Sequence, residues 1–127
     1  MKQKIIIGNW KNYLGHKESV SLAHSLSELV TKDKTRVMVS PNHLYLNEVN
    51  QILSTTNIEV ISQNLTSVES KSDTGGITLK NLKEININRS LVAHSETRIR
   101  EKNPQSILLE IIPIGFPFVL CLLYTSD

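Results

Sequence analysis

The sequence predicts an α/β fold with a parallel sheet, because short β-rich apolar runs alternate along the chain with segments of helical period. Five strands are expected, at residues 4–8, 36–39, 58–62, 90–93 and 118–121. The helical segment between neighbouring strands supplies the crossover connection that parallel strands need.

The helical segments place their apolar residues on one face. Residues 18–30 and residues 44–53 both carry such a stripe, which indicates amphipathic helices that cover a sheet. Thr78 is expected to cap a short third helix. Ser95 is expected to cap a fourth helix, which Pro104 interrupts or ends.

Two architectures satisfy this order of elements. One is an open doubly wound sheet, which would be complete at 127 residues. The other is a partial (β/α)8 barrel, whose whole form needs about 250 residues. Periodicity and composition do not choose between the two.

Composition narrows the classes of function. The net charge is +2 and the Lys and Arg residues are scattered, without the basic stripe of a nucleic-acid-binding protein. The chain has one cysteine, Cys121, so an internal disulfide is excluded and a reducing cytoplasm fits. The apolar-rich stretch 107–124 is broken by Glu110 and Pro113, so no membrane span is predicted.

In both architectures, functional groups gather at the carboxyl ends of the strands. Asn9 and Lys11 leave the first strand, where the ammonium can attract a phosphate or a developing oxyanion and the amide can fix an oxygen. Taken alone, the pair is more typical of a surface lysine beside a turn-forming asparagine.

His94 follows the fourth strand and comes just before a predicted helix. The positive end of the helix dipole disfavours the imidazolium, and a neutral imidazole can donate a hydrogen bond to a substrate carbonyl. Glu96 lies near the helix start, where a carboxylate is favourable on structural grounds alone. Seen in isolation, His94 is more simply interpreted as a loop histidine bonded to backbone.

A third polar cluster follows the third strand. Gln63 and Asn64 lead into the polar loop 64–76, and long loops in compact domains are commonly functional or mobile. Without context, such residues cap backbone groups at a strand end. No metal site is expected, because the other histidines lack the spacing of metal ligands: His16, His24 and His43.

The order of these clusters carries more information than any one of them. GNWK follows the first strand, QN the third, TGG closes the next loop and AHSETR follows the fourth strand. Together they resemble triosephosphate isomerase, whose patterns at these places are close to NWK, QN, TGE and GHSERR. The resemblance covers residues 4–121 and implies a partial TIM (β/α)8 barrel, roughly the first four βα units plus a fifth strand. Residues 1–121 are accordingly interpreted as the N-terminal half of such a barrel.

By this resemblance, Asn9 and Lys11 bind substrate, with Lys11 supplying positive charge. His94 matches the electrophile that polarises the substrate carbonyl. A neutral active-site His and a Glu base are established features of the family, and the resemblance carries over the His to His94.

The family reaction interconverts dihydroxyacetone phosphate and D-glyceraldehyde 3-phosphate by proton transfer through an enediol, in glycolysis and gluconeogenesis. The resemblance implies a small phosphorylated triose as substrate, no metal or organic cofactor, a homodimer and a cytoplasmic location. It implies no nucleic-acid or membrane partner. Thr74 and Gly75 match the loop that reaches into the neighbouring subunit, and Glu96 and Asn64 match supporting positions.

Several positions depart from the family pattern. Gly76 stands where the family usually has Glu, which weakens the expected dimer contact. Ala93 replaces a Gly before the histidine, which is a small change, and Thr97 replaces the first Arg of the RR pair.

The family's catalytic Glu, its closing loop and its Gly-rich phosphate site have no match in this sequence. Residues 122–127 do not match either, and we interpret them as a truncation or a read-through into unrelated sequence. We therefore expect the chain to be an inactive fragment of an isomerase. An alternative is a non-catalytic half-barrel that pairs with another chain. A weaker one is a small doubly wound phosphate-binding module, which the lack of a GxGxxG or GxxxxGK(S/T) loop disfavours.

Overall fold

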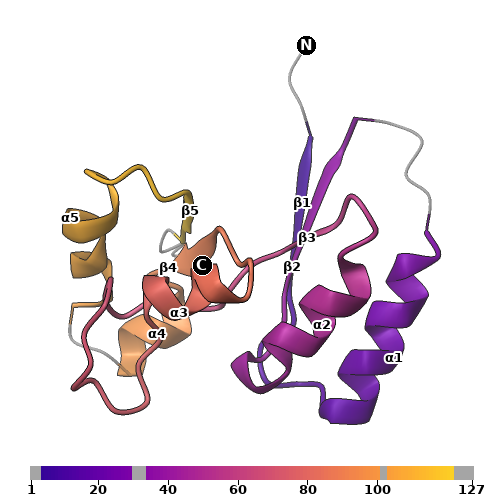
Figure 1. Ribbon diagram of the computed structural model, residues 1–127, viewed down its shortest axis with the longest axis horizontal. Coiled ribbons are helices and arrows are strands. Elements are labelled where there is room, and N and C mark those ends of the chain that lie inside the picture. The colour runs from indigo at the N-terminus through magenta and orange to yellow at the C-terminus, as the bar shows by residue number, and fades with distance from the viewer. Residues whose placement is uncertain (1–3, 30–33, 101–102, 122–127) are drawn as a thin grey trace, which may run out of the picture. The chain divides into compact units, whose positions relative to one another are not determined.

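The computed structural model describes residues 4–29, 34–100 and 103–121 of the 127-residue chain (Figure 1). The chain divides into two compact units, unit 1 (residues 1–63) and unit 2 (residues 64–127). Strands alternate with helices in both units, and every strand pairing is parallel, so the predicted α/β class is confirmed. No helix in the described ranges is both long and apolar enough to cross a membrane.

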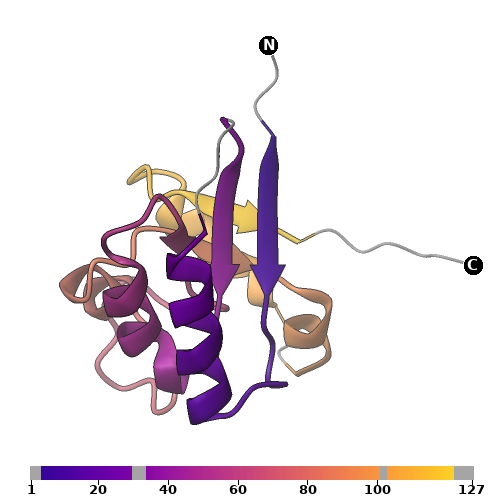
Figure 2. The ribbon, with the colours of Figure 1, turned by 90° about the vertical axis from the view of Figure 1, so that its right-hand side faces the viewer.

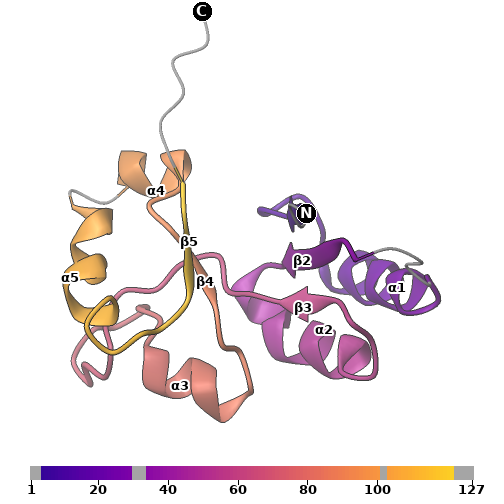
Figure 3. The same ribbon diagram turned by 90° about the horizontal axis from the view of Figure 1, so that it is seen from above.

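Unit 1 is a parallel sheet with helices on one face. Its elements run β1 (Ile5–Asn9), α1 (His16–Ser27), β2 (Arg36–Ser40), the 3-10 turn η1 (His43–Tyr45), α2 (Leu46–Leu53) and β3 (Glu59–Val60). The strand order is β1-β2-β3, and Figure 2 shows β1 and β2 running in the same direction. Figures 1 and 3 show α1 and α2 side by side on one face of this sheet. These elements follow the predicted order, with α1 shifted to begin and end slightly earlier.

The core of unit 1 explains why its helices form. The apolar stripe of α2 buries Leu46, Val49 and Leu53, and the adjoining strands bury Met38 and Val60. Burial of such side chains is the main favourable term in folding. The ladder also extends beyond the two residues of β3, because the Ile61 amide donates to the Val39 carbonyl at 2.9 Å.

The first strand of unit 1 is more exposed than the other two strands of its sheet. Ile5 and Ile6 are 52% and 58% exposed, and Ile7 is 36% exposed. Successive side chains of a strand point to opposite faces, so apolar surface is exposed on both faces of β1. Exposed contiguous apolar surface of this kind marks a place where a further element or partner packs.

Unit 2 has its own short parallel pairing. Its elements run α3 (Leu79–Glu84), β4 (Ser90–Val92), α4 (Ser95–Arg100), the 3-10 turn η2 (Pro104–Ile107), α5 (Leu108–Ile111) and β5 (Phe118–Leu120). β4 and β5 pair from Ser90–Phe118 to Val92–Leu120, side by side in Figure 3. The buried apolar side chains of unit 2 are Leu65, Leu79, Leu82, Ile87, Leu91, Val92, Ala93, Ile107, Ile111 and Phe116.

The boundaries in unit 2 refine the predicted ones. The Thr78 hydroxyl accepts the Asn81 amide at 3.2 Å, which confirms the predicted cap of α3. Ser95 is the first residue of α4 rather than the residue before it, so the cap position falls on His94. Pro104 begins η2, where its missing amide hydrogen is tolerated. The predicted tail at 122–127 lies outside the described residues.

The core of unit 1 gives a direct stability test. Leu53 is 1% exposed and Leu44, in the neighbouring turn, is 81% exposed. Leu53→Ala should lower the free energy of unfolding by about 2–5 kcal/mol, since it leaves a cavity in a packed core. Leu44→Ala should change it by less than about 0.5 kcal/mol. Urea denaturation measures both, and equal effects would show that α2 does not pack as described.

Candidate active site

The residues after β1 form a tight, well-bonded turn. The Asn9 side-chain oxygen accepts the Lys11 backbone amide at 2.9 Å, and the Tyr13 amide donates to the Trp10 carbonyl at 3.3 Å. Lys11 has a φ of +50°, in the left-handed region. That conformation costs a non-glycine residue about 1–3 kcal/mol and is concentrated at functional sites.

The turn is tied to the ends of the next two strands. The Gln63 side-chain nitrogen donates to the Lys11 carbonyl at 2.9 Å and to the Ser40 carbonyl at 3.1 Å. The Trp10 amide donates to the same Ser40 carbonyl at 3.0 Å. The ends of β1 and β2 and the residues after β3 therefore hold Lys11 jointly.

Lys11 is half-buried, and its ammonium contacts an aromatic ring. Its Nζ lies 5.8 Å from the ring centroid of Tyr13, a cation–π contact that is worth about 0.5–1 kcal/mol at an exposed site. A lysine whose backbone is fixed in this way presents a cationic end that can attract the phosphate of a ligand. Tyr13 was not anticipated from the sequence, because an aromatic residue two positions from a lysine is too common a pattern to single out.

His94 sits directly before α4, and its ring bonds the helix. The ring Nδ1 accepts the Glu96 backbone amide at 3.2 Å. The same nitrogen lies 3.9 Å from Glu96 Oε1, which is beyond hydrogen-bond distance. The hydrogen bond from the amide, and not the carboxylate, therefore determines which ring nitrogen carries the proton. An accepting Nδ1 carries no proton, which leaves the neutral imidazole with its proton on Nε2, able to donate to a carbonyl.

From the sequence, Ala93 in place of the family's Gly before this histidine is a small change. Its backbone conformation makes the change a larger one. Ala93 has a φ of +59° and is 1% exposed. Glycine populates the left-handed region without penalty, whereas alanine is strained there. This chain therefore holds an alanine in the left-handed conformation at a cost in free energy.

The loop 64–76 closes on itself within unit 2. The Thr66 amide donates to the Ile77 carbonyl at 2.8 Å, and the Thr66 hydroxyl lies 2.7 Å from Asp73 Oδ2. Thr74 is exposed near the tip, and Gly75 has a φ of +82° that glycine adopts most readily. A Cβ at Gly76 would collide with the Asp73 carboxylate, which would have to move to admit a side chain there.

The structure brings the predicted residues together in two groups. Asn9, Lys11 and Gln63 meet within unit 1. His94 and Glu96 meet within unit 2, where Asn64 is also buried, at 7% exposed. Within the described ranges, no three His, Cys, Asp or Glu side chains are grouped as metal ligands would be.

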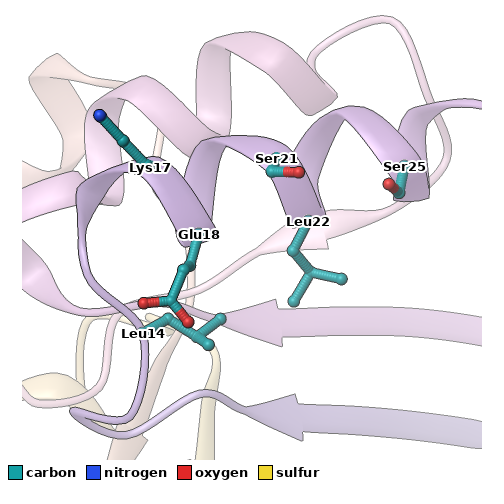
Figure 4. Close-up of a pocket in the computed structure, with 6 residues that line it drawn as sticks. All are labelled: Leu14, Lys17, Glu18, Ser21, Leu22 and Ser25. Carbon is teal, nitrogen blue, oxygen red and sulfur yellow. The ribbon is translucent and has the colours of Figure 1, made fainter.

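A separate groove of about 520 Å³ runs along α1 (Figure 4). It is lined by Leu14, Lys17, Glu18, Ser21, Leu22 and Ser25. Asn9, Lys11 and Gln63 do not line it, so it is distinct from the residues at the strand ends.

The hydrogen bond to His94 predicts a single tautomer. In the neutral ring, we expect the proton on Nε2, because Nδ1 accepts the Glu96 amide. Nitrogen-15 correlation spectra of the imidazole rings distinguish the two tautomers, and the exposed His24 of α1 provides an internal reference. A spectrum in which His94 carries its proton on Nδ1 would rule out the described geometry.

Comparisons with known proteins agree with these observations. A profile of the triosephosphate isomerase family matches residues 4–121. Triosephosphate isomerase of Leptospira interrogans serogroup Icterohaemorrhagiae serovar copenhageni is 41% identical over 101 residues, which are 77% of this chain and 40% of that relative. The enzymes so named in Leptospira borgpetersenii serovar Hardjo-bovis and Thermoanaerobacter pseudethanolicus are 38% and 37% identical, with the same shares covered.

The matched part of the chain spans 40% of the length of these relatives. The profile match runs from β1 to β5, and the parallel strands agree with a partial TIM barrel. The chain belongs to the triosephosphate isomerase family.

Proposed function

We propose that the chain is the N-terminal part of a triosephosphate isomerase, which interconverts dihydroxyacetone phosphate and D-glyceraldehyde 3-phosphate by proton transfer through an enediol, in glycolysis and gluconeogenesis. The observation that supports this most is the Lys11 turn, strained and yet bonded on both sides by Asn9 and Gln63. A surface lysine without a function has no need of such a turn.

Each residue then has a chemical role. Lys11 attracts the phosphate-bearing, anionic substrate, and the Asn9 amide helps to fix one of its oxygens. His94 donates from Nε2 to the substrate carbonyl, and this bond strengthens as negative charge develops on the oxygen. Glu96 supports His94 through its backbone amide, and Asn64 supports the start of the loop.

The elements correspond, in this proposal, to the first four βα units of the barrel and its fifth strand, with residues 1–121 as the barrel's N-terminal half. The base that removes the substrate proton comes from the part of the family fold beyond this match. The 127 residues alone are then insufficient for turnover, because no Asp or Glu in them matches the base. The reaction takes place in the cytoplasm and uses no cofactor.

The loop around Thr74 and Gly75 serves, in this proposal, as the dimer contact of the intact enzyme. Its closure through Thr66 and Ile77 supports a preformed shape, and the exposure of Thr74 leaves the tip accessible. A preformed loop loses little conformational entropy when it enters a partner.

The roles can be tested in a chimera that joins residues 1–121 to the part of the Leptospira interrogans relative that follows its matched region. Lys11→Ala should raise KM and lower kcat together, reducing kcat/KM by about 100-fold or more, since the charge acts on bound substrate and transition state. His94→Gln should mainly lower kcat, by about 100- to 1,000-fold.

A coupled assay in both reaction directions measures these constants. The 127-residue chain serves as the control and should show no turnover above a Lys11→Ala version of itself. Near-normal kinetics of both chimera variants would mean that the motif match is superficial, and turnover by the 127-residue chain would contradict its proposed insufficiency.

A second candidate function is a non-catalytic half-barrel that pairs with another chain. The observation that favours it is the exposed first strand, with apolar side chains uncovered on both faces at Ile5, Ile6 and Ile7. A strand paired along one side presents amide and carbonyl groups to another chain.

Self-association tests this candidate. The 127-residue chain should elute as a species larger than its 14.3 kDa mass, and Ile6→Lys should shift it towards the monomer, since a charge on an exposed strand blocks pairing. Leu44→Lys, at an exposed site away from β1, should have no such effect. Size-exclusion chromatography with light scattering measures both, and a sharp monomer with cooperative unfolding would exclude a half-barrel that pairs with a second copy of itself and would favour a complete doubly wound domain.

A further inference from the structure

We propose that Asp73 is the residue through which the loop 64–76 recognises a second copy of this chain: its carboxylate, held beside the tip of the loop, pairs with a positively charged side chain of that copy. The inference rests on the proposed function, from which it takes the role of the Thr74 and Gly75 tip as the dimer contact. All the groups of the loop lie within unit 2.

The tip of the loop is a tight turn that places residues 73 and 76 side by side. The Gly76 amide donates to the Asp73 carbonyl at 2.9 Å, and Gly75, the third of the four residues, has a φ of +82°. Both features are those of a type II turn, in which the Cα atoms of the first and fourth residues lie within about 7 Å of each other. A side chain on residue 73 can therefore reach the space that a side chain on residue 76 would use.

The Asp73 carboxylate fills that space and is held there. A Cβ at Gly76 would overlap Oδ2 of Asp73 and the hydroxyl oxygen of Thr66. That hydroxyl donates to Asp73 Oδ2 at 2.7 Å, the nearer of its two acceptors, since the Ile77 carbonyl lies 3.1 Å away. Its oxygen accepts the Ile77 amide at 2.9 Å. The glycine at 76 thus leaves room for a carboxylate that the closed loop keeps in one place.

The carboxylate is fixed, yet one of its oxygens is still available. Asp73 is exposed, and among the described residues its second oxygen, Oδ1, has no hydrogen-bond partner. Thr74, next to it at the tip, is exposed as well. When the tip enters a partner, this oxygen leaves water, and charges that leave water in proteins are paired. The surface that receives the tip should therefore carry a cation opposite Asp73.

A purely structural role for Asp73 makes a different prediction. Closing the loop needs only an oxygen that accepts the Thr66 hydroxyl, and the side-chain oxygen of an asparagine accepts it as a carboxylate does. Pairing with a cation needs the charge. Asp73→Asn therefore separates the two roles, because it keeps the oxygen and removes the charge.

The first test measures the dimer dissociation constant of the chimera that carries residues 1–121, by sedimentation equilibrium over a dilution series. Asp73→Asn should weaken the dimer about tenfold, and Asp73→Lys, which opposes two like charges, about 100-fold. Glu69→Gln removes the same charge from another exposed position of the loop and should change the constant by less than about twofold. An Asp73→Lys dimer no weaker than that of Asp73→Asn would rule out a cation as the partner group.

The second test uses position 76, where the expected sign is opposite to that of a simple repair. Gly76→Glu restores the residue of the family pattern, but here it should weaken the dimer about tenfold, because its side chain displaces the Asp73 carboxylate and the Thr66 hydroxyl. Asp73→Ala frees that space, so the double variant should dimerise at least about threefold more tightly than Gly76→Glu alone. A Gly76→Glu chimera that dimerises as tightly as the natural sequence would contradict the proposal.

A third measurement shows whether a variant acts by opening the loop. In the 127-residue chain, the Thr66 and Ile77 amides both bond across the loop, so their hydrogen exchange reports its closure. Asp73→Asn should leave the exchange rates within about threefold of the natural chain, and Gly76→Glu should raise them about tenfold. A tenfold rise in Asp73→Asn would assign Asp73 to loop closure and overturn its role in recognition.

The failures of this inference and of the proposed function are distinct. If the natural chimera dimerises and Asp73→Asn dimerises equally well, the role of Asp73 fails and the dimer contact of the loop stands. If the natural chimera stays monomeric, the dimer contact under the proposed function fails, and the role of Asp73 fails with it. The isomerase reaction is measured separately, by kcat/KM of the same chimera.

Discussion

The parallel register of β1 and β2 is the constraint on which the rest of unit 1 depends. It sets Asn9 opposite Ser40 at the last pair of the ladder, so both strands end at the same edge. β3 joins the other side of β2, which brings Gln63 to that edge within reach of the Ser40 carbonyl. A slip of one residue would turn every side chain of a strand to the opposite face and separate these groups.

The strand ends of both units use the same local device. Asn9 at the end of β1, Asn42 after β2 and His94 after β4 each accept, through a side-chain atom, the backbone amide two residues further on. Such bonds satisfy a donor that the strand has ceased to pair, and they bend the chain out of the sheet. At Asn9 and His94 the bond also selects a functional geometry, the Lys11 turn in one case and the ring tautomer in the other.

Features that depend on residues close together in the sequence, such as strands and helices, could be predicted from the sequence. Alternation of apolar runs predicted the strands and helices, and Lys11, Gln63 and His94 follow strands in the structure as they were expected to. Boundaries were less predictable, since Ser95 and Pro104 are each acceptable at more than one position of a helix start. The Gln63 bonds were not specified by the sequence, because they join residues 52 and 23 positions apart. The exposure of Ile5 and Ile6 was equally hidden, since an apolar strand looks the same whether it is covered or not.

Gly76 lacks the side chain that the family pattern has at this position, but a neighbouring carboxylate lies where a side chain of residue 76 would begin. That carboxylate belongs to Asp73. The Thr66 hydroxyl bonds that carboxylate at 2.7 Å and also accepts the Ile77 amide at 2.9 Å. The loop is therefore closed and carries an acidic group, which residue 73 supplies three positions before the glycine. A side chain at 76 would displace Asp73 and disturb the threonine that closes the loop, so the glycine and the aspartate are structurally coupled in this chain.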